Sequence, residues 1–315
     1  MSRTLAYTLL IATTLTLALA GYNETLAFDY AHVAAATSCP SDQLLNLSCG
    51  SYCDYLKENG YSVYFSKIYD QGDSTSVSFS MFYNKAKKLF VTSFRQTISD
   101  KQVLKEFLGI YGTAYTLHSN LQGNPAVFHY FYDKYTNVLR ADVITNLKKA
   151  LKEFPADTSI LFTGHSLGSA LTTQAALDAK LEGLLENRNV QVYAFGSPRV
   201  GNYDFASLYN SLLPETYRII HYKDTSTRIP PCVWNVFTGE CVKSSINSLL
   251  WAPYHVNNEV YYYEGNMAFG DYVVCQDEDE SCQREVSLIN SVNSDHDHYF
   301  NITMLCVPWE KNIFQ

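Results

Sequence analysis

A single serine lies between two glycines in the stretch FTGHSLGSA, residues 162–170. An apolar run precedes the stretch and a helix-forming run follows it, which is the context in which G-x-S-x-G makes a sharp strand-to-helix turn. Glycines are needed beside the serine because side chains there would collide with neighbouring backbone. The pattern predicts that Ser166 is a nucleophile; the alternative is a glycine–serine turn without chemistry.

A nucleophilic serine needs a base to remove its proton and a carboxylate to orient that base. After a turn of this kind the expected chain order is Ser, then Asp or Glu, then His. Asp224 follows the apolar run YRIIHY with one lysine between, so it would lie at the carboxyl edge of a parallel sheet, although an Asp before Thr-Ser-Thr can also cap a turn. We therefore expect Asp224 to be the carboxylate.

Two histidines near the C-terminus, in SDHDHYFNI, are candidates for the base. They are His296 and His298, and their spacing alone does not choose between them. The DHDH run also resembles a metal site, but two histidines and two aspartates in a polar loop are more often solvated. We expect no metal, and serine-based hydrolysis requires no organic cofactor.

Strands and helices alternate through the middle of the chain. Apolar runs predict strands at residues 87–94, 159–163, 190–195 and 217–222, with helices between them at residues 136–154, 167–185 and 203–213. In the first helix, apolar residues recur at spacings of four and three and form one stripe. This alternation predicts an α/β fold with a mostly parallel sheet and reactive residues beyond the carboxyl ends of its strands.

Composition and charge narrow the class of protein. With 315 residues, 47% of them hydrophobic, and no repeat or linker, we expect one domain over residues 21–315. Residues 1–20 carry an early arginine, a short apolar stretch and a small-x-small ending, which indicates a signal peptide; the alternative is a membrane anchor. The formal charge of −8 argues against nucleic acid binding, and no later stretch is apolar and long enough for a transmembrane segment.

The cysteines and glycosylation sequons fit the secretory route. The chain has eight cysteines, an even number, without the paired C-x-x-C spacing of a zinc site, so disulfides are expected. Sequons begin at Asn23, Asn46 and Asn301. We expect a glycoprotein that is secreted, either to the outside of the cell or into the lumen of a digestive vacuole.

Four motifs, TGHSLGSAL, AFGSPRVGN, RIIHYKDTSTRIPP and DHDHYF, resemble in sequence and order those of the fungal-type, class 3 lipases, which have the α/β-hydrolase fold. The resemblance covers residues 83–306. The last family motif is a histidine with a tyrosine three residues later, usually followed by phenylalanine, which fits His296 and not His298. The resemblance therefore implies Ser166 as nucleophile, Asp224 as carboxylate and His296 as base.

The resemblance also implies an oxyanion hole. In these lipases a strand ending in F-R-G-S or F-R-G-T supplies one donor, here Thr97, and the backbone N–H of Leu167 supplies the second. This chain departs from the family at two glycines, with Gln96 before Thr97 and Ser169 in place of the second glycine of SLGGA. If the position of Gln96 requires a positive φ, the oxyanion loop is strained or differently shaped; Ser169 could alter how helix and strand pack.

Residues 98–111, ISDKQVLKEFLGIY, take the place of the short helical lid of these lipases. Their apolar residues recur at helical spacing with charged residues between, which suits a segment that covers the acyl pocket in water and moves away at a lipid surface. The alternative is a surface helix docked permanently on the core, because its pattern would be the same.

The family layout implies a disulfide framework that the spacing of the cysteines cannot establish alone. The implied bridges are Cys39–Cys306, Cys49–Cys53, Cys232–Cys241 and Cys275–Cys282. Separately, His255 and Glu259 resemble a family feature without a direct catalytic role, and we interpret them as structural.

The resemblance implies a secreted serine ester hydrolase that acts on acylglycerols at a lipid–water interface, without an obligate protein partner. Three alternatives stay open: a phospholipase A1, an esterase for soluble or feruloyl-type esters, and a lipid-binding lookalike that has lost catalysis. The first two would share every motif above. The presence of Ser166, Asp224 and His296 argues against the third.

Overall fold

The structure is a computed structural model that describes residues 21–70, 75–99, 102, 112–243, 252–276, 278, 282 and 293–306. The expected signal peptide at residues 1–20 lies outside the described residues, and so does most of the expected lid at residues 98–111. Within the described part of the chain, the helices lack the combination of length and apolar character that crossing a membrane requires.

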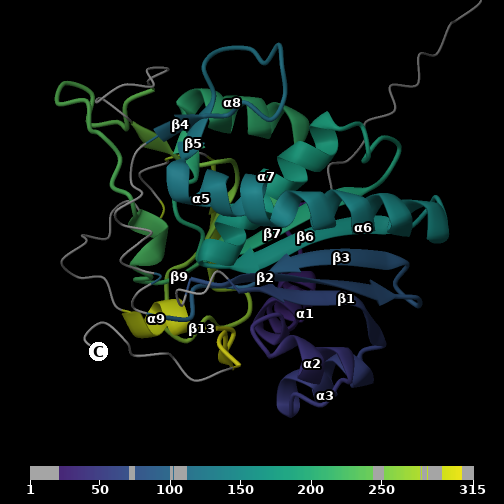
Figure 1. Ribbon diagram of the computed structural model, residues 1–315. Coiled ribbons are helices and arrows are strands. Elements are labelled where there is room, and N and C mark those ends of the chain that lie inside the picture. The colour runs from purple at the N-terminus through teal and green to yellow at the C-terminus, as the bar shows by residue number, and fades with distance from the viewer. Residues whose placement is uncertain are drawn as a thin grey trace, which may run out of the picture.

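The centre of the molecule is an eight-stranded sheet with strand order β1-β2-β3-β6-β7-β9-β11-β12 (Figure 1). Strands β3, β6, β7, β9 and β11 are parallel, and β1, β2 and β12 extend the two edges in antiparallel pairing. The predicted strands are all present, as β3, β6, β7 and β9, so the mostly parallel sheet is confirmed. The strand bounds are β1 Tyr61–Tyr69, β2 Val77–Asn84, β3 Leu89–Phe94, β6 Ser159–His165, β7 Val190–Phe195, β9 Thr216–His221, β11 Glu259–Tyr262 and β12 Tyr272–Cys275.

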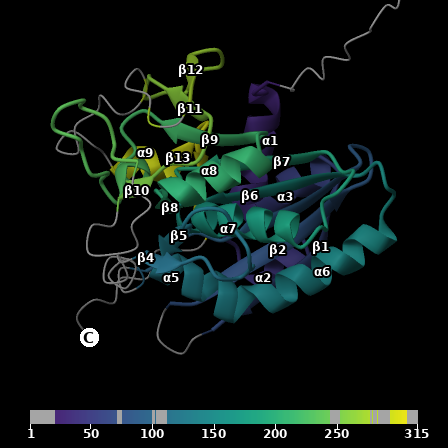
Figure 2. The same cartoon turned by 90° about the horizontal axis from the view of Figure 1, so that it is seen from above.

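Helices cover both faces of this sheet (Figures 1 and 2). On one face lie α5 (His129–Asp133), α6 (Arg140–Glu153), α7 (Leu167–Leu181) and α8 (Tyr203–Leu212), with a π-helical stretch, η1 (Lys134–Leu139), joining α5 to α6. The predicted apolar stripe of α6 packs inward, because Val143 and Leu147 are fully buried. Each face therefore has its own hydrophobic core.

The opposite face is covered by α1 (Glu24–Ala36), α2 (Ser41–Leu45) and α3 (Ser51–Glu58), which the sequence reasoning does not predict. Helix α1 begins where the side chain of Asn23 accepts a hydrogen bond from the Leu26 N–H, a typical N-cap. Its alanines are buried, and these small side chains let the helix pack against the sheet.

Short elements surround the carboxyl ends of the parallel strands. A second sheet has the order β10-β8-β5-β4, and the C-terminal hairpin pairs β13 with β14 after helix α9. Their bounds are β4 Gly112–Ala114, β5 Ala126–Phe128, β8 Gly201–Asn202, β10 Pro253–Tyr254, α9 Asn293–Asp297, β13 His298–Tyr299 and β14 Ile302–Thr303, with a short 3-10 turn, η2, at Ser226–Arg228.

The disulfide framework is confirmed. The bridges are Cys39–Cys306, Cys49–Cys53, Cys232–Cys241 and Cys275–Cys282, with no free cysteine. Cys39–Cys306 joins residues 267 positions apart and fastens the end of the C-terminal hairpin beside the N-terminal helices. The bridge therefore restrains the segment that carries His296.

Candidate active site

Ser166 occupies the turn between β6 and α7 with φ 55° and ψ −127°, a conformation that residues other than glycine rarely adopt. The neighbouring glycines leave room for this turn. A Cβ on Gly168 would lie 2.1 Å from the carbonyl oxygen of Phe94, and a Cβ on Gly164 would lie 2.6 Å from the carbonyl group of Gly168. Any side chain at these positions would force the backbone apart.

The structure brings Ser166, His296 and Asp224 into one hydrogen-bonded chain. His296 Nε2 lies 2.8 Å from the Ser166 hydroxyl, and His296 Nδ1 lies 3.0 Å from both carboxylate oxygens of Asp224. Because the carboxylate only accepts, Nδ1 carries the hydrogen and the lone pair of Nε2 faces the serine hydroxyl. This is the tautomer that a general base requires.

Asp224 is fully buried, and further donors hold its charge. The Tyr299 hydroxyl donates to Oδ2 at 2.5 Å, and the Ser226 N–H donates to Oδ1 at 2.8 Å. Burial by itself would raise the pKa of Asp224, but the nearby His296 and the hydrogen bonds from His296 and Tyr299 outweigh it, so the pKa is lowered. Burial raises the pKa of Tyr299 well above its ordinary value, with the Asp224 charge as the next cause, and the phenol remains a donor.

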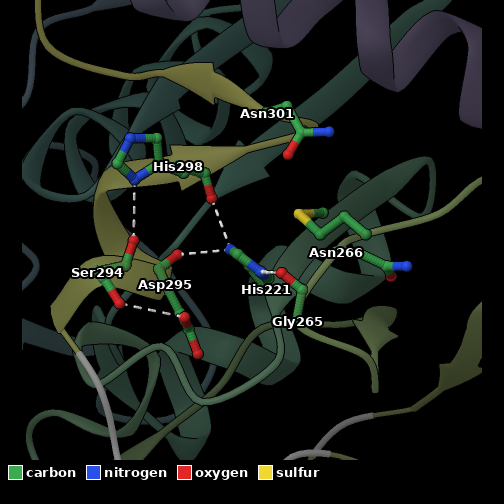
Figure 3. A pocket seen from close by; sticks show the side chains of 8 residues that line it. His221, Gly265, Asn266, Ser294, Asp295, His298 and Asn301 are labelled. Carbon is green, nitrogen blue, oxygen red and sulfur yellow. Dashed lines mark hydrogen bonds between the residues drawn. The ribbon is translucent and has the colours of Figure 1, made fainter.

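His298, the second candidate for the base, points elsewhere. Its side chain is exposed, and its Nδ1 lies 3.1 Å from the carbonyl oxygen of Ser294 (Figure 3). The two histidines of the DHDH run therefore point in different directions: His296 toward Ser166 and His298 toward solvent.

The group with metal-like spacing in the described part of the chain lies elsewhere, at His118, Asp178 and Glu182. There Arg140 donates to both carboxylates, at 2.9 Å and 2.8 Å, so a guanidinium already supplies the positive charge. His118 and Tyr135 donate to the same buried Asp178, at 2.7 Å and 2.6 Å. We therefore interpret the cluster as an ion-pair network that anchors α7.

The expected oxyanion residues lie on either side of the strand-to-helix turn at Ser166, which we call the elbow. Leu167 is the first residue of α7, so its N–H belongs to the free amino end of that helix, which favours negative charge. Thr97 is buried and follows the end of β3, the strand whose last carbonyl faces Gly168.

Gln96 does not strain this loop through its backbone, since its φ is not positive. Its side chain instead links two parts of the site. Nε2 donates to the Met304 carbonyl at 3.0 Å, and Oε1 contacts His165 Nδ1. The oxyanion loop is thus tied to the elbow and to the C-terminal hairpin, contacts that a glycine could not make.

Ser169, the other departure, does not disturb the packing of helix and strand. It is fully buried, and its hydroxyl donates to the Ser166 carbonyl at 2.5 Å. The residues interpreted as structural lie in a buried polar network: Glu259 pairs with Arg218 at 3.2 Å, and the His255 N–H donates to Glu278 at 3.0 Å.

Two histidines that the sequence reasoning missed hold the backbone around His296. His165 Nε2 lies 2.8 Å from the carbonyl oxygen of His296, and their rings lie 4.5 Å apart. His221 contacts the carbonyls of Asp295 and His298 and lines a pocket of about 270 Å³ behind the hairpin (Figure 3). No local pattern in YRIIHY distinguishes this strand histidine from an ordinary buried one. Ser166 does not line that pocket, so we do not assign it to the substrate.

The strand order and the strand–turn–helix at Ser166 define an α/β-hydrolase fold. Solved structures agree: a lipase from Rhizopus microsporus var. chinensis superposes with a TM-score of 0.71 at 23% identity, over 90% of this chain and 89% of that one. Lipase II from Rhizopus niveus superposes with a TM-score of 0.72 at 20% identity, over 90% of this chain and 96% of that one. The predicted fold class is confirmed.

Residues 91–234 match the family described as lipase (class 3). Lipase ZK262.3 of Caenorhabditis elegans is 33% identical over 159 residues, 45% of this chain and 44% of that protein. The secreted mono- and diacylglycerol lipase 1 of Fusarium solani is 35% identical over 96 residues, which are 30% of this chain and 28% of that protein. Phospholipase A1-IIalpha of Arabidopsis thaliana is 30% identical over 146 residues, which are 40% of this chain and 33% of that protein. The resemblance to class 3 lipases is confirmed, although the matches span less than half the length of these curated relatives.

Proposed function

We propose that this protein is a serine ester hydrolase of the lipase type, which cleaves acylglycerol ester bonds through an acyl-enzyme intermediate on Ser166. The observation that carries the proposal is the unbroken hydrogen-bonded chain from the Ser166 hydroxyl through His296 to the buried Asp224. The match to class 3 lipases and the names of the relatives support the ester substrate.

The reaction follows from the roles that these atoms can take. His296 Nε2 removes the Ser166 proton while Oγ attacks the ester carbonyl, and the N–H groups of Leu167 and Thr97, with the Thr97 hydroxyl, stabilise the oxyanion. His296 then protonates the departing alcohol, activates a water molecule against the acyl-enzyme, and the fatty acid leaves. Asp224 stays ionised throughout, consistent with its lowered pKa.

A disulfide-closed loop supports action at a lipid surface. Residues 232–241 form a hairpin between Cys232 and Cys241, and its tip presents Val236 and Phe237 with 86% and 95% of their surface exposed. In both ribbon views this loop lies on the same side of the molecule as α9 (Figures 1 and 2). Exposed apolar side chains on a stiff loop are suited to insertion into a lipid interface.

Secretion belongs to the same proposal. The signal-like residues 1–20, the disulfides and the name of the secreted Fusarium relative support an extracellular or vacuolar lumen location for one mature domain over residues 21–315. A phospholipase A1 is the second candidate function, because relatives with that name match this chain.

The test is hydrolysis of triacylglycerols, phospholipids and short soluble esters by the purified protein, with and without an interface. Labelling with a fluorophosphonate probe identifies the nucleophile. Ser166→Ala is expected to lose labelling and about 10⁴- to 10⁶-fold in kcat. Thr173→Ala, a buried hydroxyl on the same helix, is the matched control and should keep both. Failure of the wild-type protein to react with the probe would support the non-catalytic lookalike.

A further inference from the structure

His221, the last residue of β9, contacts helix α9, which carries His296, and the following strand β13, and it is only 6% exposed (Figure 3). Its Nδ1 lies 2.9 Å from the carbonyl oxygen of Asp295 and 2.6 Å from that of His298. Its Nε2 lies 3.0 Å from the carbonyl oxygen of Gly265. Both ring nitrogens therefore face backbone carbonyls.

The three carbonyl contacts determine how many protons the His221 ring must carry. A carbonyl oxygen only accepts hydrogen bonds, and a backbone carbonyl, unlike a side-chain amide, cannot exchange its oxygen for a donor. A neutral imidazole has one N–H, so it would turn the lone pair of its other nitrogen toward an acceptor within hydrogen-bonding distance. Only the doubly protonated imidazolium donates to all three carbonyls.

These contacts surround the proposed base. Asp295 immediately precedes His296 and His298 follows it by two residues, so His221 holds the backbone on both sides. The His296 carbonyl itself contacts His165. On its own side, His221 ends the strand that leads to Asp224. His221 thus links the segment carrying the base to the strand positioning its carboxylate.

The charged groups near His221 come from every element packed against it. The titratable residues are Lys223 and Asp224 after β9, Tyr262 on β11, Glu264 beside Gly265, Asp295 and His296 in α9, and His298 and Tyr299 in β13. Burial raises the pKa of both Tyr262 and Tyr299, so these two remain uncharged. The carboxylates of Asp224 and Asp295 are compatible with a cation here, and the Asp295 carboxylate accepts from the Lys223 N–H at 3.2 Å.

We propose that His221 is a positioning residue of the hydrolase proposed above, acting as an imidazolium that fastens helix α9 and strand β13, on either side of His296, to β9. Loss of one ring proton turns one contact into a repulsion between lone pairs, so that α9 and β13 are held less firmly. The inference depends on the proposed function for its kinetic consequence, but not for the protonation state of His221.

Nitrogen-15 NMR of the histidine rings in the inactive Ser166→Ala protein tests the protonation state directly. We expect both ring nitrogens of His221 to give imidazolium signals at neutral pH. A neutral ring, with one protonated and one bare nitrogen, would overturn the proposal even if the enzyme is fully active. The resonances are assigned through correlations to the backbone, so this measurement does not depend on a variant that folds.

Kinetics with a soluble ester test the positioning role. His221→Gln offers a carbonyl oxygen where a donor is needed, and we expect kcat to fall by about 10² with little change in KM, as for a small misplacement of a catalytic group. His298→Gln, which changes an exposed side chain on the neighbouring strand β13, is the matched control and should keep the wild-type kcat and KM. An unchanged kcat in His221→Gln would refute the positioning role, whereas a wild-type protein inert to fluorophosphonate would refute the proposed function instead.

Discussion

Tyr299→Phe tests whether the charge of Asp224 is held by its buried donors. The substitution removes the hydroxyl that donates to Asp224 Oδ2 at 2.5 Å and keeps the ring, which packs edge-on against Phe195 and His165. A hydrogen bond to a charged group contributes about 1.5–3 kcal/mol. Because Asp224 has no exposure and the bond is short, we expect the free energy of unfolding to fall by about 2–3 kcal/mol at neutral pH.

The lowered pKa of Asp224 determines how the stability deficit of Tyr299→Phe should vary with pH. The pKa of Asp224 is lowered in the folded protein, so its ionised form stabilises the fold above the ordinary aspartate pKa of about 3.9. That contribution is lost as the pH falls through the lowered folded value. Since Tyr299 helps to lower the pKa, the deficit of Tyr299→Phe should be largest at neutral pH and should shrink in acid.

Urea unfolding followed by circular dichroism, at neutral pH and in acid, measures the deficit. Tyr209→Phe is the matched control, because this fully buried hydroxyl lies 3.1 Å from the neutral Thr216 hydroxyl. Its cost should be about 0.5–1.5 kcal/mol and independent of pH. Hydrolysis of a soluble ester by Tyr299→Phe should slow by roughly tenfold, because 1.4 kcal/mol of lost orientation of His296 corresponds to that factor. Equal deficits for the two variants at every pH would refute the reasoning.

Two further substitutions test the packing at Gly168 and the exposed loop between Cys232 and Cys241. Gly168→Ala should destabilise the protein by roughly 1–3 kcal/mol or more and abolish probe labelling, because the new Cβ would lie 2.1 Å from the Phe94 carbonyl oxygen. Gly265→Ala is the control, because a Cβ there would have its nearest neighbour at 3.5 Å. Equal melting temperatures for the two variants would contradict the packing explanation. The double change Val236→Ser and Phe237→Ser should reduce hydrolysis of emulsified triacylglycerol and binding to lipid vesicles while leaving cleavage of a dissolved ester unchanged, since both side chains are exposed and contribute nothing to the core. Loss of activity on both substrates alike would show that the loop does not act through the interface.

The sheet and the elbow are predictable from the sequence because their signals are local. Apolar runs separated by helical patterns gave β3, β6, β7 and β9, and the two glycines beside Ser166 marked the turn. The position of Asp224, three residues beyond the end of β9, followed from the same alternation. The choice of His296 over His298 did not follow from spacing, and came from the resemblance to class 3 lipases.

The remaining features depend on contacts between distant parts of the chain. The sequence alone determined which apolar runs become the central strands β3, β6, β7 and β9, although not their end residues, and that one serine lies on a turn too tight for side chains. Both signals are local, because hydrophobic period and turn chemistry act over a few neighbouring residues. Only the tertiary structure decided that Gln96 reaches Met304, 208 residues away, and that His221 faces the carbonyls around His296, more than 70 residues away. Such hydrogen bonds form where packing brings backbone carbonyls beside a side chain from a distant part of the chain, and no local sequence pattern predicts that contact.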